Sequence, residues 1–469
     1  MCFYALTSDQ SRATLLDNQL KTDINAIKAE IAKSGYKTRL AVALMSDTSS
    51  SPQSVTQGIQ ERLENIRKGT GLDTGKSIFY IAPRKSSEEL TEAADTILTA
   101  LYPQSLEYYR DLGRHARKKK NRGIIPPPTI PPTSGTSQTL SLSGWQVRYD
   151  FKMAVFSEFR QEIDVAMRTY EHAYDELLSE EVWDLIPSWS PRWNEARLLS
   201  DIIAIRVLRC FLWNEQTSMA VSRWQAHRDR IGEFIDQRGR GTNNYGWKAW
   251  ETRWSLVMAN LIERMDIPGL HPSTGLLYLP PEKGLPRERL YPWELMHHTG
   301  YWYRQAAWHT AARRALAYSM PEEDRQPPES SAAAASTNAG YTYDTYMCPE
   351  PYLEFPLDKP GVDYSRLIID CLMAARTQFH ARGQHRLVAE VSLECARESA
   401  KLEQWEDVIA LLRPVWEDMP FRREGWTDIV EDVNWTLRAA AAKKGLGDLV
   451  LAIDWELFHR SESYRVKGC

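Results

Sequence analysis

Residues 149 to 174, YDFKMAVFSEFRQEIDVAMRTYEHAY, place apolar side chains at helical spacing on both sides of a polar RQE stretch. The pattern predicts two helices, the first ending near Arg160, because the polar residues interrupt the apolar stripe. In the second helix, Ala166, Tyr170 and Ala173 follow the spacing of small, aromatic and small residues found in tetratricopeptide hairpins. There the small residues let two helices approach, and the ring fills the gap between them. Such a hairpin buries its apolar face only by stacking on neighbours.

The same spacing recurs twice further along the chain. Ala220 and Trp224 repeat it, although His227 stands where the pattern has a small residue. Residues 395 to 420 give a third copy, in which these residues take the expected places: Ala396 in the first helix, Trp405 at the turn, Val408, Leu412 and Val415 in the second helix, and Pro420 as terminator. The copies do not keep a constant period of about 34 residues. The sequence therefore predicts a mainly α fold, a degenerate TPR-like α-solenoid.

Residues 1 to 122 have a different pattern, in which helices alternate with short apolar strands. The expected helices cover about 14 to 34, 54 to 68 and 86 to 121, and the expected strands cover 39 to 47 and 76 to 83. Two strands joined by a helix form a right-handed parallel βαβ unit. Because about three strands are needed for an independently stable sheet, we expect this α/β domain to be small and incomplete.

Proline-rich and low-complexity stretches divide the chain. The predicted domains are 1–122, a partial α/β domain with a long C-terminal helix, then a Pro/Ser-rich linker at 123–143, and an α-solenoid at 144–469. The linker contains PPPTIPP, which cannot continue a helix and is expected to act as a stiff spacer. A low-complexity insert at about 320–341 is predicted to be a loop within the solenoid.

The bulk composition excludes several classes of protein. With 43% apolar and 26% charged residues the chain has the composition of a globular protein. Its net charge of −4 provides no general attraction for nucleic acid, so we expect no nucleic-acid partner. No apolar run is as long as the about 20 residues of a membrane span. The six cysteines lack a C-x-x-C pair, and the first residues do not resemble a signal peptide, which favours a reducing, cytoplasmic location.

Three motifs contain residue types that occur in binding sites. GTGLDTGKS (69 to 77) lacks the spacing of a phosphate-binding loop and is predicted to be a turn between helix and strand. The basic run from Arg114 to Arg122 is expected to be a solvated helix end, with anion binding as the lesser alternative. His297, His298 and His309 are too widely spread for one metal ion. We therefore predict no catalytic, cofactor-binding or metal-binding residues and no cofactor.

The 17 tryptophans leave two other functions open. An (α/α)-toroid glycoside hydrolase would use aromatic rings to line a cleft around two carboxylates about 5 to 9.5 Å apart. A repeat scaffold of an RNA-processing complex would also contain Trp- and Tyr-bearing helical hairpins. Many of the tryptophans lie beside Arg or within amphipathic faces, as packing residues do. A nonenzymatic scaffold is the favoured hypothesis.

Four long stretches resemble a known family. They are GWQVRYDFKMAVFSEFRQEIDVAMRTYEHAYDELL (144 to 178), WSPRWNEARLLSDIIAIRVLRCFLW (189 to 213), HRDRIGEFIDQRGRGTNNYGWKAWETRWSLVMANLIE (227 to 263) and FHARGQHRLVAEVSLECARESAKLEQWEDVIALLRPVWEDMP (379 to 420). They are similar to the foie gras domain family of trafficking protein particle (TRAPP) complex subunit 11 in its fungal form. The resemblance covers roughly 144 to 460. The βαβ stretch with SLEYYRDLGRHARKKK resembles the segment just before that domain.

The resemblance implies a peripheral subunit of a TRAPP III-type vesicle-tethering complex in ER-to-Golgi transport and autophagy. In that family other subunits promote nucleotide exchange on a Rab GTPase, so no catalytic residue is carried over. The implied partners are other TRAPP subunits and, indirectly, a Rab GTPase and Golgi or vesicle membranes. The implied location is the cytoplasm, peripherally at early Golgi or ER-Golgi intermediate membranes. Family members are longer at both ends, so the chain is expected to be a fragment or a shortened form.

Overall fold

The computed structural model describes residues 1–7, 10–34, 38–46, 56–82, 86–123, 141–187, 191–237, 241–265, 267, 270, 289–291, 293–325, 351–355, 361–418 and 426–467. The chain divides into two compact units. One contains Met1–Gly123 with Lys152–Val165, and the other contains Ile124–Phe151 with Ala166–Cys469. The boundaries drawn from the sequence remain a prediction, and most of the proposed linker and insert, 124–140 and 326–341, lies outside the described residues.

The first unit contains a parallel sheet with the strand order β1-β2-β3. The strands are β1 (Cys2–Leu6), β2 (Val42–Ser46) and β3 (Ile78–Ile81). Leu44 pairs with Tyr4 on one side and with Tyr80 on the other. The two strands predicted from sequence are confirmed, and β1 adds a third that sequence analysis missed. The described sheet thus has the about three strands that independent stability requires.

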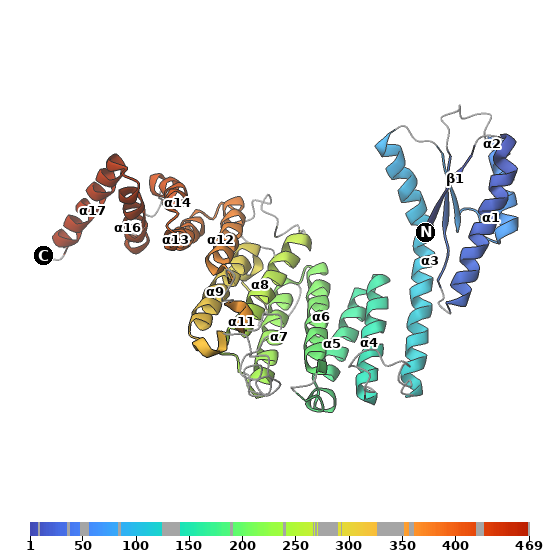
Figure 1. The fold of residues 1–469 in the computed structure, drawn as a ribbon, viewed down its shortest axis with the longest axis horizontal. Helices are drawn as coiled ribbons and strands as arrows, with labels where there is room; N and C mark the ends of the chain where they lie inside the picture. Colours follow the sequence, from blue (N-terminus) through green and yellow to red (C-terminus); the bar gives the residue numbers. More distant parts are fainter. Residues whose placement is uncertain are drawn as a thin grey trace. The chain divides into compact units, whose positions relative to one another are not determined.

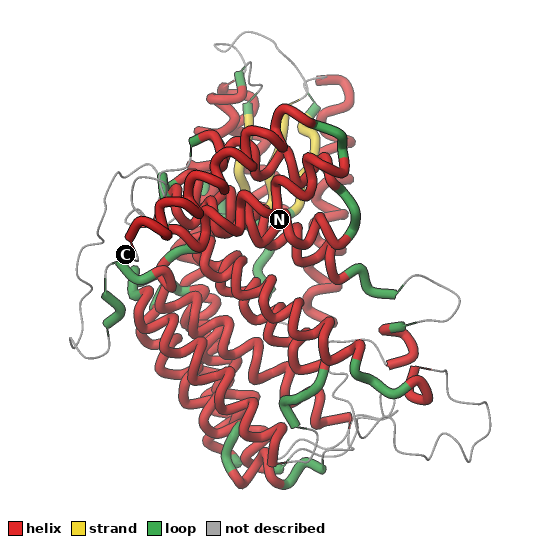
Figure 2. Tube along the Cα trace, turned by 90° about the vertical axis from the view of Figure 1, so that its left-hand side faces the viewer, coloured by secondary structure: helices red, strands yellow, loops and turns green. Residues whose placement is uncertain are grey.

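Helices cover both faces of this sheet (Figures 1 and 2). They are α1 (Gln10–Lys33), α2 (Thr56–Thr70) and α3 (Ser87–Arg122). The core between the strands and α1 and α2 contains these side chains: Leu6, Leu20, Ile24, Val42, Leu44, Ile66 and Ile78. Since β1, β2 and β3 are adjacent and parallel, right-handed crossovers place both connecting helices on one face. The long helix α3 runs along the other face, where Gln104 Nε2 donates to the carbonyl of Lys76 at 2.7 Å.

The second unit is a stack of helices. Its helices are α4 (Leu142–Phe159, shared with the first unit), α5 (Ile163–Leu177, also shared), α6 (Pro191–Trp213), α7 (Thr217–Gln237), α8 (Tyr245–Met265), α9 (Thr299–Tyr318), α11 (Pro351–Glu354), α12 (Tyr364–Ala381), α13 (His385–Lys401), α14 (Trp405–Glu417), α16 (Thr427–Lys443) and α17 (Gly447–Lys467). From α8 to α17 the long helices pack on their neighbours in chain order. The predicted fold class, a solenoid-type helical stack preceded by a small α/β domain, is confirmed. Within the described part of the chain, no helix has both the length and the apolarity to span a bilayer.

Five tight turns between consecutive helices share one backbone geometry. Each has a residue in the left-handed region, namely Gln161, Glu215, Gly383, Glu403 or Gly445. In the turn from α13 to α14, the Glu403 N–H donates to the carbonyl of Ala400 and the Gln404 N–H to that of Ser399, at 3.1 and 3.0 Å. The other four turns repeat this pair of hydrogen bonds, which is the Schellman motif that ends a helix. The hairpin predicted around residues 160 to 162 and the one predicted within residues 395 to 420 therefore both turn through a Schellman motif.

Candidate functional site

A buried chain of hydrogen bonds joins α5, α6, α7 and α8. The hydroxyl of Tyr174 lies 2.8 Å from Nδ1 of His227, and Nε2 of His227 lies 2.8 Å from Oδ1 of Asp201. Trp250 Nε1 donates to the other oxygen of Asp201 at 2.9 Å. All four residues are at most 6% exposed. One side chain from each of four helices therefore takes part in a single polar network.

The chemistry of the partners fixes the direction of one of these bonds. A carboxylate only accepts, so His227 donates from Nε2 to Asp201, and the Tyr174 hydroxyl meets the ring at Nδ1. Burial raises the pKa of Tyr174 well above its ordinary value, which keeps this hydroxyl protonated. The guanidinium carbons of Arg223 and Arg230 lie 4.6 and 5.3 Å from the centroid of the Tyr174 ring.

This set of residue types also occurs in nucleophilic catalysis, where a base is oriented by a carboxylate. Here, however, Tyr174, His227 and Asp201 are all buried by packed helices, so a substrate could not reach the histidine. The network can fix the relative positions of α5, α6, α7 and α8, because each hydrogen bond joins side chains from two of these helices. In the second tetratricopeptide-like copy, His227 stands where the pattern has a small residue. Its ring is buried there because both of its nitrogen atoms have polar partners, Tyr174 and Asp201.

The aromatic rings singled out by the repeat pattern lie inside the stack. Tyr170 and Trp224 are buried, and Trp405 packs against the apolar cluster of α13, α14, α16 and α17. Trp224 and Trp254 each donate from Nε1 to the other's backbone carbonyl, at 2.9 and 3.2 Å. The prediction that these rings serve as packing residues is confirmed. Tyr170, Trp224 and Trp405 therefore do not form the aromatic cleft that the glycosidase hypothesis requires.

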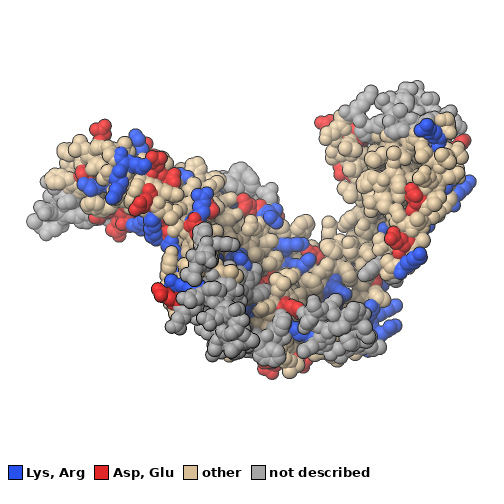
Figure 3. All heavy atoms as spheres, viewed as in Figure 1, with Lys and Arg blue, Asp and Glu red and all other residues tan. Residues whose placement is uncertain are grey.

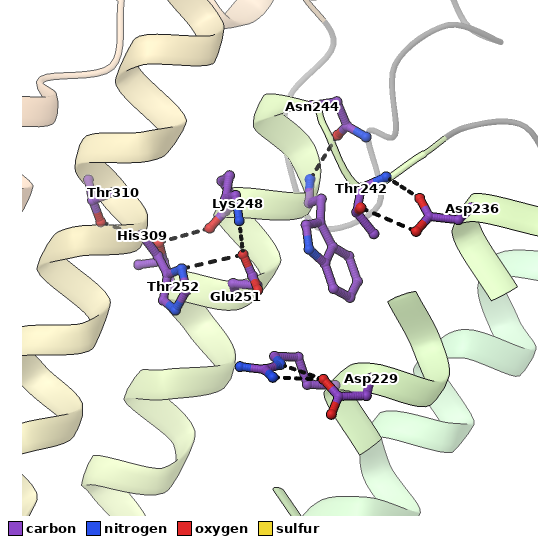
Figure 4. A network of polar contacts seen from close by, with 11 residues as sticks. Asp229, Asp236, Thr242, Asn244, Lys248, Glu251, Thr252, His309 and Thr310 are labelled. Carbon is purple, nitrogen blue, oxygen red and sulfur yellow. Dashed lines mark hydrogen bonds and ion pairs between the residues drawn. The ribbon is translucent and has the colours of Figure 1, made fainter. Parts of the chain in front are cut away.

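A second polar network joins α8 and α9 (Figure 4). The buried carboxylate of Glu251 accepts from Lys248 Nζ at 2.6 Å and lies 3.3 Å from His309 Nδ1. Burial alone would raise the pKa of Glu251, but the hydrogen bond from His309 and the charge of Lys248 outweigh it and lower this pKa. The hydroxyls of Thr252 and Thr310, the next residues along α8 and α9, lie 3.3 Å apart. At the start of α8, Asn244 accepts from the Trp247 N–H as a helix cap, and Asp236 at the end of α7 accepts from the N–H of Thr242.

Two Arg–Glu pairs bind α9 to the next helices. Arg313 makes a two-pronged contact with the buried carboxylate of Glu354, at 2.9 and 3.0 Å. Arg314 does the same with Glu398 on α13, at 2.7 and 2.9 Å. Burial opposes ionisation of Glu398, yet Arg314 and Lys401 together lower its pKa to about 2. The polar contacts of α9 therefore reach in both directions along the stack.

The histidines considered as metal ligands are separated by the fold. His309 pairs with Glu251, whereas His297 and His298 are buried or half-buried just before α9. Burial and the nearby charge of Arg382 lower the pKa of His298 to about 3, so its ring is neutral at pH 7. The absence of metal-binding residues remains a prediction.

Sequence analysis missed one group with the composition of a metal site. His172 Nδ1 lies 3.3 Å from Asp150 Oδ2 and 3.9 Å from Glu176 Oε2. Asp150 is buried on α4, and His172 is exposed to solvent on α5. The spacing of four residues between His172 and Glu176 on a predicted helix was a visible signal, but it gave no indication of Asp150.

A cavity of about 540 Å³ lies beside α4 and α6. Its wall is mainly apolar, with Val147, Phe151 and Leu199 among the lining residues, and it also includes Arg148 and Arg192. The guanidinium of Arg148 is stacked on Trp145 at 5.0 Å. The cavity therefore combines an apolar wall with two cationic side chains and the carboxylate of Glu195.

The remaining sequence motifs have ordinary structural roles. GTGLDTGKS forms the turn between α2 and β3, in which the N–H groups of Ser77 and Ile78 donate to the carbonyl of Asp73 at 2.8 and 3.0 Å. The predicted turn is confirmed. The basic run ends α3, where Gly123 provides a left-handed cap. Figure 3 shows acidic and basic side chains interspersed over the face in view, without a large region of one sign.

Large apolar side chains are exposed on the last two helices of the stack. Those with the greatest exposure are Leu451 at 74%, Trp455 at 67%, Phe458 at 59% and Trp435 at 53%. Leu451, Trp455 and Phe458 are spaced by four and three residues, so they form one stripe along α17. We call these four residues the terminal stripe. Contiguous exposed apolar patches occur at protein, membrane and ligand contacts.

The fold defines a protein of the helical-stack class, with a small α/β domain ahead of the stack in the chain. The sequence pattern of the Foie gras liver health family 1 matches residues 192–460, more than half of the chain, and the chain belongs to this family. The pattern of the Trafficking protein particle complex subunit 11 N-terminal domain matches residues 1–90.

Curated relatives share both regions. Trafficking protein particle complex subunit 11 from Bos taurus and from Homo sapiens are each 22% identical to the chain over 452 residues, covering 92% of this chain and 35% of the relative. The Gallus gallus protein of the same name is 21% identical over 449 residues. The chain thus spans about a third of the length of the curated relatives it matches. The family resemblance found in the sequence is confirmed.

Proposed function

We propose that this chain is a nonenzymatic scaffold subunit of a TRAPP III-type vesicle-tethering complex. It would act in ER-to-Golgi transport and autophagy, in the cytoplasm at early Golgi or ER-Golgi intermediate membranes. The observation that carries the proposal is the similarity over 92% of the chain to proteins named as subunits of the trafficking protein particle complex. Both matched regions occur in one chain, at 1–90 and 192–460.

The physical character of the stack agrees with a scaffold. Many of its tryptophan and tyrosine rings are buried between helices, and its Tyr-His-Asp network is buried. Its terminal stripe exposes the kind of aromatic anchor that contributes most of the binding energy in protein interfaces. In this proposal nucleotide exchange on a Rab GTPase belongs to the partner subunits, and membrane contact is indirect.

Affinity purification of the tagged full chain from cells that express it tests this proposal. We expect mass spectrometry to identify other TRAPP subunits among the co-eluting proteins. Recovery of the intact, folded chain with no vesicle-tethering subunit would refute the proposal.

A second measurement tests whether the chain itself catalyses nucleotide exchange. The purified chain alone should leave the rate of nucleotide release from a Rab GTPase unchanged, and acceleration by the chain alone would contradict the assignment of exchange to other subunits.

A further inference from the structure

Three side chains of metal-binding type meet between α4 and α5. Asp150 lies on α4, and His172 and Glu176 lie four residues apart on α5, which makes them neighbours on that helix. Nδ1 of His172 is 3.3 Å from Oδ2 of Asp150 and 3.9 Å from Oε2 of Glu176. The three potential ligand atoms all lie within 4.8 Å of one another. All three residues belong to the second compact unit.

The distances between these atoms are close to those of a zinc site. Zinc binds nitrogen and carboxylate oxygen at about 2.0 to 2.2 Å in tetrahedral geometry, so neighbouring ligand atoms are about 3.3 to 3.6 Å apart. The distance from His172 to Asp150 falls in this range, and the distance from His172 to Glu176 is slightly longer. Because the His172 side chain is 64% exposed, a small rotation of its ring can bring the three atoms to one ion.

The donor set favours zinc over the other common divalent ions. Zinc takes imidazole nitrogen together with carboxylate oxygen, whereas Mg²⁺ and Ca²⁺ prefer oxygen ligands alone. A neutral imidazole carries one proton, and when this proton is on Nε2 of His172, Nδ1 has a lone pair for the metal. Two carboxylates balance the charge of a divalent ion, so no additional anion is required.

The burial of the three side chains suits an accessible site with fixed ligands. The Asp150 side chain is 4% exposed and that of Glu176 is 17% exposed, so packing restricts both carboxylates. Ligands that are held in place by packing bind an ion at a lower entropic cost. The exposed ring of His172 gives the site an open side, where an ion can enter and where water can take the fourth position.

We propose that Asp150, His172 and Glu176 bind one zinc ion, which links α4 to α5. Because the ligands come from two helices, binding of the ion stabilises the packing of these helices against each other. The inference goes beyond the scaffold function and does not depend on it. It replaces the prediction that the chain has no metal-binding residues with three named ligands.

Calorimetric titration of the full chain with Zn²⁺, without a polyhistidine tag, tests the proposal. We expect Zn²⁺ to bind and Mg²⁺ not to bind at the same concentration. Loss of even an outer partner of a ligand lowers metal affinity about 10- to 100-fold, so His172→Ala should weaken zinc binding at least tenfold. His385→Ala is the matched control, since His385 is an exposed histidine on α13 with an alanine, Ala389, four residues further on. Its zinc affinity should equal that of the unchanged chain.

Cobalt(II) in place of zinc identifies the ligand atoms through its absorption spectrum. Nitrogen and oxygen ligands give visible ligand-field bands without the charge-transfer band of a cobalt–sulfur bond. We expect this spectrum from the unchanged chain, and its loss in His172→Ala and in Glu176→Gln. Failure of the intact chain to bind Zn²⁺, a cobalt–sulfur band, or binding unchanged in both variants would overturn the proposal and leave the three residues as an ion-pair cluster. These outcomes are independent of whether TRAPP subunits co-purify.

Discussion

The buried network around His227 yields the sharpest prediction about stability. Replacing His227 with Phe keeps a ring of similar size but removes both nitrogen atoms. Asp201 then loses one of its two donors, and the Tyr174 hydroxyl loses its partner on the ring. A hydrogen bond to a charged group contributes about 1.5 to 3 kcal/mol, and a buried hydroxyl left without a partner costs about 1 to 3 kcal/mol. Trp250 still donates to Asp201, so we expect a loss of about 3 to 4 kcal/mol in the free energy of unfolding.

Urea unfolding followed by tryptophan fluorescence measures this loss, because Trp250 and Trp254 lie in the same packed region. His385→Phe is the control, since His385 is exposed at the start of α13 and its substitution should cost less than about 1 kcal/mol. A double-mutant cycle with Asp201→Asn should give a coupling energy of at least about 1 kcal/mol. A cost below 1 kcal/mol for His227→Phe, or strictly additive effects in the cycle, would show that the network does not hold the helices together.

Three further predictions concern turns, pH and close packing. Glu403→Gly should stabilise the stack by up to about 1 kcal/mol in urea unfolding, because glycine adopts the left-handed conformation without strain; a lower midpoint would contradict the turn assignment. Glu398, whose pKa is lowered to about 2, should contribute stability above pH 4.5 that is lost as the pH falls toward 2. Thermal melts of Glu398→Gln should depend less on pH in that window, and an unchanged slope would count against the pair. Gly300→Ala should destabilise by about 1 to 3 kcal/mol because a Cβ would lie 2.9 Å from the Phe379 ring. Gly58→Ala on α2, where the space is open, should be neutral or stabilising by up to about 1 kcal/mol, and equal effects at the two glycines would refute the close approach.

The packing roles of the repeat residues could be predicted because they follow from local spacing. Ala166, Tyr170 and Ala173 must lie on one face of any helix that contains them, and all three are buried. Strand β1 could not be predicted in the same way. Its strand conformation depends on pairing with β2, which is 40 residues away in the chain.

The polar networks depend on contacts between distant helices, which a single sequence does not reveal. His227 was recognised as a misfit, but its partners Tyr174 and Asp201 are 53 and 26 residues away. The exposure of the terminal stripe could not be predicted from the sequence either. Helix α17 has apolar residues on two faces, and only the packing of α16 decides that Ile453 is buried while Leu451 is exposed.

Oxidative footprinting of the tryptophans, read by mass spectrometry, tests most directly whether the rings are buried between packed helices. Trp224, Trp250 and Trp302 should be protected in the native chain, whereas Trp455 and Trp435 should be labelled rapidly. Denaturation should equalise all five rates. Labelling of native Trp224 and Trp250 as fast as Trp455 would mean that these rings face solvent, and it would contradict the account of the stack as a scaffold with an aromatic core.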